Sequence, residues 1–173
     1  MLVVVAIVVG ADPAGVRWLV VGAAAFGVLG DAALLGPGTK WFIRGLLAFA
    51  VGHSLYVAAA LGVGVGVTAW WGVAFVLLLF SWRFLPQVVP AARRSGGTAM
   101  MIAVLFYATV IAAMVITATG TGRWLAAIGA ALFAVSDWVL GQRQFVGPDT
   151  FRRLAVMVPY HAGQALLIVG LLR

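Results

Sequence analysis

The sequence predicts an all-α fold: a polytopic bundle of transmembrane helices that forms one integral-membrane domain over residues 1–173. Two observations predict it. Of the 173 residues, 65% are hydrophobic and 9% are charged, and the mean hydropathy is +1.16, whereas a soluble domain has roughly 45–50% apolar and about 25% charged residues. The apolar residues also gather in runs of about 20, the length that a helix needs to cross roughly 30 Å of hydrocarbon. Lipid must therefore solvate most of the chain.

Six apolar segments have this length to within a few residues, and we expect one helix from each. They are Val16–Leu35, Trp41–Leu61, Val63–Trp82, Thr98–Ala118, Trp124–Gly141 and Leu154–Leu172. The sequences between them are rich in residues that break helices, namely Gly36-Pro37-Gly38, the Pro86 to Gly97 stretch, Gly120-Thr121-Gly122 and Gly147-Pro148-Asp149. Only the boundary at Gly62–Gly66 is indistinct, because it contains glycine but no charged residue.

A further apolar run occupies Met1–Ala11. As a helix it would rise only about 16 Å, which is too short to cross a bilayer. A secretory signal peptide is disfavoured because no basic residues precede the run. We interpret it as the last half of a helix, which brings the predicted number of segments to about seven.

The basic residues predict the orientation. If the loops alternate between the two sides, one side receives eight cationic residues and the other receives three, Arg17, Arg123 and Arg173. The positive-inside rule makes the first side cytoplasmic and the C-terminus extracytoplasmic. We therefore assign the net charge of +7 to topology and predict a bacterial inner-membrane protein with no nucleic-acid partner.

Ionisable groups inside a membrane are costly and are functional candidates by default. The polar residues that fall within the predicted helices are Asp31, His53, Tyr56, Ser136, Asp137, Tyr160, His161 and Gln164. With 1.5 Å per residue, Asp31 and Asp137 share a level about 6–8 Å below the cytoplasmic edge. His161 enters from the same side, so four helices bring polar groups to one half of the bundle. The alternative for each aspartate is a helix-packing role, and for Ser136 a packing hydroxyl.

Four local patterns, in this order, resemble the YhhN-like membrane proteins, the lysoplasmalogenase family. They are Leu29-Gly30-Asp31-Ala32, Gly52-His53-Ser54-Leu55-Tyr56, Ala131-Leu132-Phe133-Ala134-Val135-Ser136-Asp137 and Tyr160-His161-Ala162-Gly163-Gln164. The resemblance covers roughly Val16 to Leu172. It implies an eight-helix bundle that cleaves the vinyl-ether bond of lysoplasmalogens, with Asp31 and Asp137 as catalytic residues. The family's first helix is not matched, so we expect a chain that is truncated at its N-terminus relative to the family.

Vinyl-ether chemistry needs such a pair. Protonation of the β-carbon gives an oxocarbenium-like cation, water adds, and the hemiacetal collapses to an aldehyde and an alcohol. One carboxyl group would deliver the proton and the other would stabilise the cation, much as two carboxylates do in glycoside hydrolysis. The residues expected to orient the pair or the substrate are His53, Tyr56, Ser136, Tyr160, His161 and Gln164, with Arg83 as a phosphate contact.

Two other functions remain open from the residues alone. A zinc-dependent lipid hydrolase would use His53, His161 and one aspartate as ligands, and a proton-coupled transporter would use the same groups as a relay. A retinal protein is excluded, because the single lysine, Lys40, lies in a predicted loop. We predict a lysophospholipid substrate, contact with membrane lipids, and neither a cofactor nor a bound metal. The absence of cysteine excludes thiolate chemistry.

Overall fold

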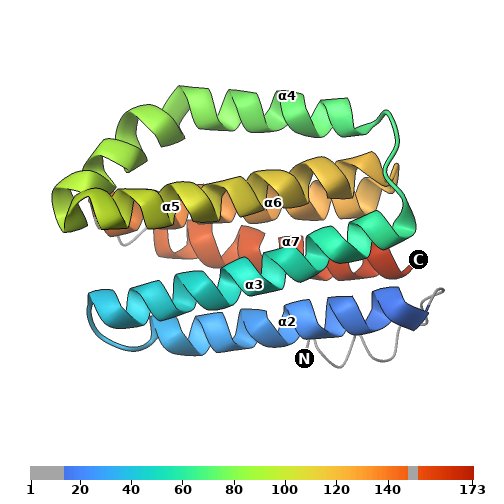
Figure 1. The fold of residues 1–173 in the computed structure, drawn as a ribbon, viewed down its shortest axis with the longest axis horizontal. Coiled ribbons are helices and arrows are strands. Elements are labelled where there is room, and N and C mark those ends of the chain that lie inside the picture. Colours follow the sequence, from blue (N-terminus) through green and yellow to red (C-terminus); the bar gives the residue numbers. More distant parts are fainter. Residues whose placement is uncertain (1–13, 148–151) are drawn as a thin grey trace.

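The computed structural model describes residues 14–147 and 152–173, which form a bundle of long, roughly aligned helices (Figure 1). In chain order the elements are α2 (Ala14–Leu34), α3 (Thr39–Val63), α4 (Ala69–Leu79), η1 (Phe80–Val88), α5 (Val89–Gly120), α6 (Trp124–Gly141), η2 (Gln142–Val146) and α7 (Arg152–Leu172). The two η segments are π-helical. The predicted all-α class is confirmed, while the Met1–Ala11 run lies outside the described residues.

Five helical stretches in the described part of the chain are long and apolar enough to cross a membrane. One of them, Ala69–Gly120, is 52 residues long, more than twice the length that one crossing needs. It folds back on itself, so it supplies two crossings (Figure 1). The chain is thus an integral membrane protein, and the predicted count of about seven segments is slightly high for the residues described.

The predicted loop from Pro86 to Gly97 is wrong, because most of this stretch is helical. Pro86 lies inside η1 and Pro90 lies in the first turn of α5. A proline is tolerated in a first turn, where its missing N–H has no helical partner, and the wider π-helical turn already displaces the regular hydrogen bonds around Pro86. The chain reverses at two residues, Gly96 and Gly97. Gly97 has φ of 68°, a left-handed conformation that favours glycine.

The structure places the two predicted groups of loops at opposite ends of the bundle (Figure 1). The α2–α3 connection, the reversal at Gly96–Gly97 and η2 lie at one end, which we call the arginine-rich end. The α3–α4 and α5–α6 connections and Arg173 lie at the other. Which end faces the cytoplasm stays a prediction.

We expect a reporter fused after Arg173 to read as extracytoplasmic and one inserted between Gly96 and Gly97 to read as cytoplasmic, because the sequence predicts eight basic residues for the arginine-rich end and three for the other. Paired alkaline phosphatase and fluorescent protein fusions would measure this. The reverse pattern would contradict the orientation, although both aspartates would keep their common level.

Two helical hairpins, α2–α3 and α6–α7, have the most extensive helix contacts in the bundle. Small residues allow the close approach of α6 and α7. A Cβ atom on Gly163 would lie 2.8 Å from the Gly129 carbonyl oxygen and 2.9 Å from the Phe133 backbone nitrogen. Small residues at membrane helix interfaces permit such backbone contact. This packing fixes the helical position of Tyr160, one turn before Gly163.

Replacing Gly163 with alanine should destabilise the bundle by about 1–3 kcal/mol, because the added methyl group meets rigid backbone on α6. The apparent melting temperature in detergent should fall. Gly15→Ala is the matched control, since no heavy atom lies within 4 Å of a Cβ built there. Equal melting temperatures for the two variants would show that the α6–α7 contact is looser than described.

Candidate active site

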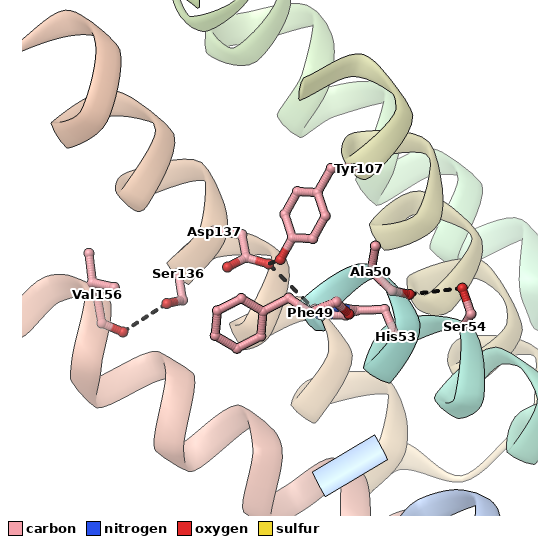
Figure 2. Close-up of polar contacts among 8 residues, drawn as sticks. All are labelled: Phe49, Ala50, His53, Ser54, Tyr107, Ser136, Asp137 and Val156. Atoms are coloured by element: carbon pink, nitrogen blue, oxygen red, sulfur yellow. Dashed lines mark hydrogen bonds and ion pairs between the residues drawn. The ribbon is translucent and has the colours of Figure 1, made fainter. Parts of the chain in front are cut away.

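Asp137 lies on α6 among residues of α3 and α5 (Figure 2). The Tyr107 hydroxyl donates a hydrogen bond of 2.9 Å to Asp137 Oδ2. His53 Nε2 lies 3.8 Å from the same oxygen, and the side chains of His53 and Asp137 are only 2% and 9% exposed. Three helices therefore enclose one carboxyl group.

Asp31 lies near the C-terminal end of α2, where it is exposed at the bundle surface. The Tyr160 hydroxyl of α7 donates a hydrogen bond of 2.8 Å to Asp31 Oδ2. Gly27, one turn before Asp31, lets α7 approach, because a Cβ atom there would lie 2.7 Å from Gln164 Nε2 and 3.5 Å from the Tyr160 hydroxyl oxygen. The two aspartates thus have the same kind of tyrosine partner but different exposure.

The two carboxyl groups are close enough to influence each other electrostatically, and Tyr160 lies within range of both. Aromatic rings connect them. The Phe133 ring is 4.6 Å from that of His53 and 5.1 Å from that of Tyr160, with edge-to-face geometry in both pairs. Such contacts hold the polar side chains in one arrangement. The structure therefore joins the surroundings of Asp31 and Asp137 through one group of aromatic contacts, and their common depth in the membrane stays a prediction.

The hydrogen bonds of His53 define its tautomer. Nδ1 is bonded to the Phe49 carbonyl oxygen one turn earlier, and a carbonyl can only accept, so Nδ1 carries the proton. In the neutral imidazole, Nε2 is then an acceptor. This buried nitrogen has no hydrogen-bond partner among the described residues, and it faces Asp137.

An apolar cavity borders the cluster, and the space between its lining residues, including the part that is open to the outside, is about 530 Å³. It lies between α3, α4, η1, α5, α6 and η2, and Asp137 and Tyr107 are part of its wall. The cavity places one carboxyl group of the pair beside an apolar space between helices.

Tyr56 and Gln164 are buried, at 2% and 4% exposure. They line a smaller cavity of about 170 Å³ with His53, Phe133 and Gly27. They adjoin the cluster from the side away from the arginine-rich end, because Tyr56 follows His53 by about one turn of α3.

The structure does not bring Ser136 to the carboxyl pair. Its hydroxyl donates a hydrogen bond of 2.8 Å to the Val156 carbonyl oxygen of α7, so it points to a different face of α6 from Asp137 (Figure 2). His161 is exposed beside Tyr160, and its Nδ1 is bonded to the Met157 carbonyl oxygen. It lies within electrostatic range of Asp31. The side chain of Arg83 lies outside the described part of the structure.

Tyr107 is a site residue that the sequence reasoning missed. It lies inside the Thr98–Ala118 apolar segment, far from both ends, and a buried tyrosine hydroxyl needs a hydrogen-bond partner. The same argument had already drawn attention to Tyr56 and Tyr160, so the signal was present in the sequence. Gly27 was missed because only the packing of α7 against α2 reveals its use.

Within residues 14–147 and 152–173, no three histidine or acidic side chains are grouped as metal ligands would be. His53 lies on α3 and His161 on α7, and the two histidines have separate backbone partners. The zinc-ligand set proposed from the sequence, with both histidines and one aspartate, is therefore not assembled by these residues.

The chain was compared with known proteins. The YhhN family profile matches residues 1–171. "Lysoplasmalogenase TMEM86B" of Mus musculus is 31% identical over 160 residues, covering 90% of this chain and 64% of the relative. The human protein of the same name is 30% identical over 163 residues, covering 92% and 66%. "Lysoplasmalogenase TMEM86A" of Bos taurus is 29% identical over 153 residues, covering 84% and 61%.

No solved structure matches the chain. The chain spans slightly less than two thirds of the length of the curated relatives given above. The family match extends over nearly all of the sequence and includes the segments that carry both aspartates. The chain belongs to the YhhN family.

Proposed function

We propose that this protein is a membrane hydrolase that cleaves the vinyl-ether bond of lysoplasmalogen-type lysophospholipids. The observation that carries the proposal is the pair of carboxyl groups on α2 and α6, each accepting a hydrogen bond from a tyrosine, beside an apolar cavity. The names of the mouse, human and bovine relatives support the same reaction. The overall reaction consumes one water and yields a fatty aldehyde and a glycerophospho-alcohol.

Asp137 is the proton donor in this proposal. The acid must touch the β-carbon of the vinyl ether, and Asp137 is the aspartate that lines the apolar cavity. Tyr107 holds Oδ2 as a hydrogen-bond acceptor, which leaves Oδ1 to carry the proton. Transfer of that proton to the β-carbon forms a new C–H bond and leaves positive charge shared between the α-carbon and the ether oxygen.

Asp31 is the carboxylate that stabilises this cation, and Tyr160 fixes its position. Water then adds to the α-carbon. His53 Nε2 is the acceptor for a proton of that water, because it is an acceptor nitrogen that faces Asp137. His53 passes this proton to Asp137, which gives it to the glycerol oxygen as the bond between that oxygen and the α-carbon breaks, so the alcohol leaves. His53 takes the hydroxyl proton of the hemiacetal, which becomes the aldehyde, and returns it to Asp137. Protons and bonds balance, and no other reactant is needed.

The decisive experiment compares three lipids with the purified protein in detergent. A 1-alkenyl lysophospholipid should yield free aldehyde. Its saturated alkyl-ether analogue and the 1-acyl lysophospholipid should both remain intact, because neither has a vinyl-ether double bond to protonate. Mass spectrometry measures all three. Cleavage of the ester alone, or of none of them, would contradict the proposed function.

A further inference from the structure

The apolar cavity beside Asp137 reaches toward the arginine-rich end of the bundle. Phe42 and Leu46 of α3 line it, and they precede His53 by about three and two helical turns. At 1.5 Å per residue the cavity therefore extends roughly 16 Å from the level of His53 toward the arginine-rich end. Its wall at that end includes Phe42 and Phe145, whose rings meet edge to face with centroids 5.6 Å apart.

The two π-helical segments form much of the remaining wall. Phe80, Phe84 and Val88 of η1 and Phe145 of η2 line the cavity. The two segments are joined by a hydrogen bond of 2.9 Å from Gln142 Nε2 to Gln87 Oε1. π-helical turns occur frequently at functional sites, and here they place aromatic rings around one space.

The chemistry of this wall selects the part of the substrate that can enter. Apart from Asp137, Tyr107 and the Trp138 indole, the lining side chains are aliphatic or aromatic or are absent, as in glycine. A glycerophosphate group placed there would lose its hydrogen bonds with water at considerable cost. A hydrocarbon chain loses none. The polar part of the substrate would then lie on the other side of the carboxyl pair, where Asp31 and His161 are exposed.

We infer that this cavity holds the aliphatic chain of the substrate, and that Leu46 and the Phe42–Phe145 pair set the longest chain that fits. The inference rests on the proposed function, and it names which part of the lipid each side of the site receives. The aliphatic chain of the substrate gains little free energy when it leaves the bilayer for the cavity, because lipid tails are as apolar as the lining residues. Selectivity then comes from shape, and bulk added to the wall should shorten the preferred chain.

Leu46→Trp tests this. Leu46 is 9% exposed and lines the cavity, whereas its neighbour Leu47 is 56% exposed on the outside of the same helix. With a series of 1-alkenyl lysophospholipids from short to long chains, Leu46→Trp should lower kcat/KM for the longest chains at least about tenfold. The same variant should change kcat/KM for the shortest chains by less than about threefold. The matched Leu47→Trp variant should keep the wild-type dependence on chain length.

Phe145→Ala should shift the chain-length preference in the opposite direction. It tests the inference even if the Leu46→Trp variant does not fold. Removal of one ring of the pair should open the end of the cavity and shift the preference to longer chains. Binding of the saturated alkyl-ether series, measured by thermal shift, should show the same two changes in preferred chain length. A folded Leu46→Trp variant that weakens every chain length equally, or a Phe145→Ala variant with the wild-type dependence, would overturn the inference.

The binding series separates this inference from the proposed function. The wild-type protein could cleave no vinyl ether and still bind the saturated lipids up to a chain length that Leu46→Trp reduces. In that case the proposed reaction is wrong, and the inferred site for the aliphatic chain is supported. If the wild-type protein cleaves vinyl ethers but the variants leave the chain-length dependence unchanged, the proposed reaction is supported and the inferred site for the aliphatic chain is wrong.

Discussion

Asp137→Asn should reduce vinyl-ether hydrolysis at least about 10²-fold, the lower range for the loss of a general acid. Asparagine keeps the shape of the side chain and can still accept the hydrogen bond from Tyr107, so the packing around α6 should survive. It cannot deliver and recover a proton. Turnover of a 1-alkenyl lysophospholipid, measured with protein of confirmed melting temperature, should show the loss mainly in kcat.

Asp31→Asn should also cost at least about 10²-fold, because the cation loses its countercharge. The double variant should be little worse than the worse single variant, since residues that act as a unit have non-additive effects. Binding of the saturated alkyl-ether analogue should be retained in all three proteins. If both single variants are folded and hydrolyse the lipid at nearly the wild-type rate, the aspartates are structural and this mechanism is wrong.

The fold was largely predictable because hydrocarbon imposes a simple rule on the chain. Apolar segments of about 20 residues bounded by glycine and proline became helices at nearly the expected positions, as for Trp124–Gly141. The error at Pro86 to Gly97 has a physical cause. A π-helical turn around Pro86 is stabilised by packing against η2 and α5, which local sequence does not encode, so the reversal moved to Gly96 and Gly97.

The candidate site was predictable in its membership more than in its geometry. The cost of burying ionisable groups identified Asp31, His53 and Asp137, and depth along the helices placed them together. Depth does not specify the direction in which a side chain points around its helix. It therefore did not separate Ser136, which bonds to α7, from Asp137, nor did it reveal that Tyr107 is the hydrogen-bond donor to Asp137. Both depend on how α5, α6 and α7 are rotated against each other.

The role of His53 can be tested apart from its packing. His53→Phe keeps an aromatic ring among Phe133 and Tyr107, whose rings lie 4.6 Å and 5.6 Å from the imidazole, but it removes the acceptor nitrogen that faces Asp137. We expect kcat to fall about 10²-fold. His53→Gln, which retains a polar acceptor, should recover part of the rate.

The pH profile distinguishes a proton acceptor from a merely structural histidine. In the wild-type protein, kcat should fall at low pH as His53 takes up a proton and ceases to accept one from water, and at high pH as Asp137 loses its proton. Asp31 must also stay ionised, so His53→Phe should remove the contribution of His53 to the low-pH limb, leave the contribution of Asp31, and leave the high-pH limb. The matched control is Ser54→Ala on the same helix, which removes only an exposed hydroxyl bonded to the Ala50 carbonyl oxygen and should preserve both limbs. A folded His53→Phe protein with an unchanged rate and an unchanged pH profile would show that His53 only packs against the aromatic rings, and the proton of the attacking water would need another acceptor.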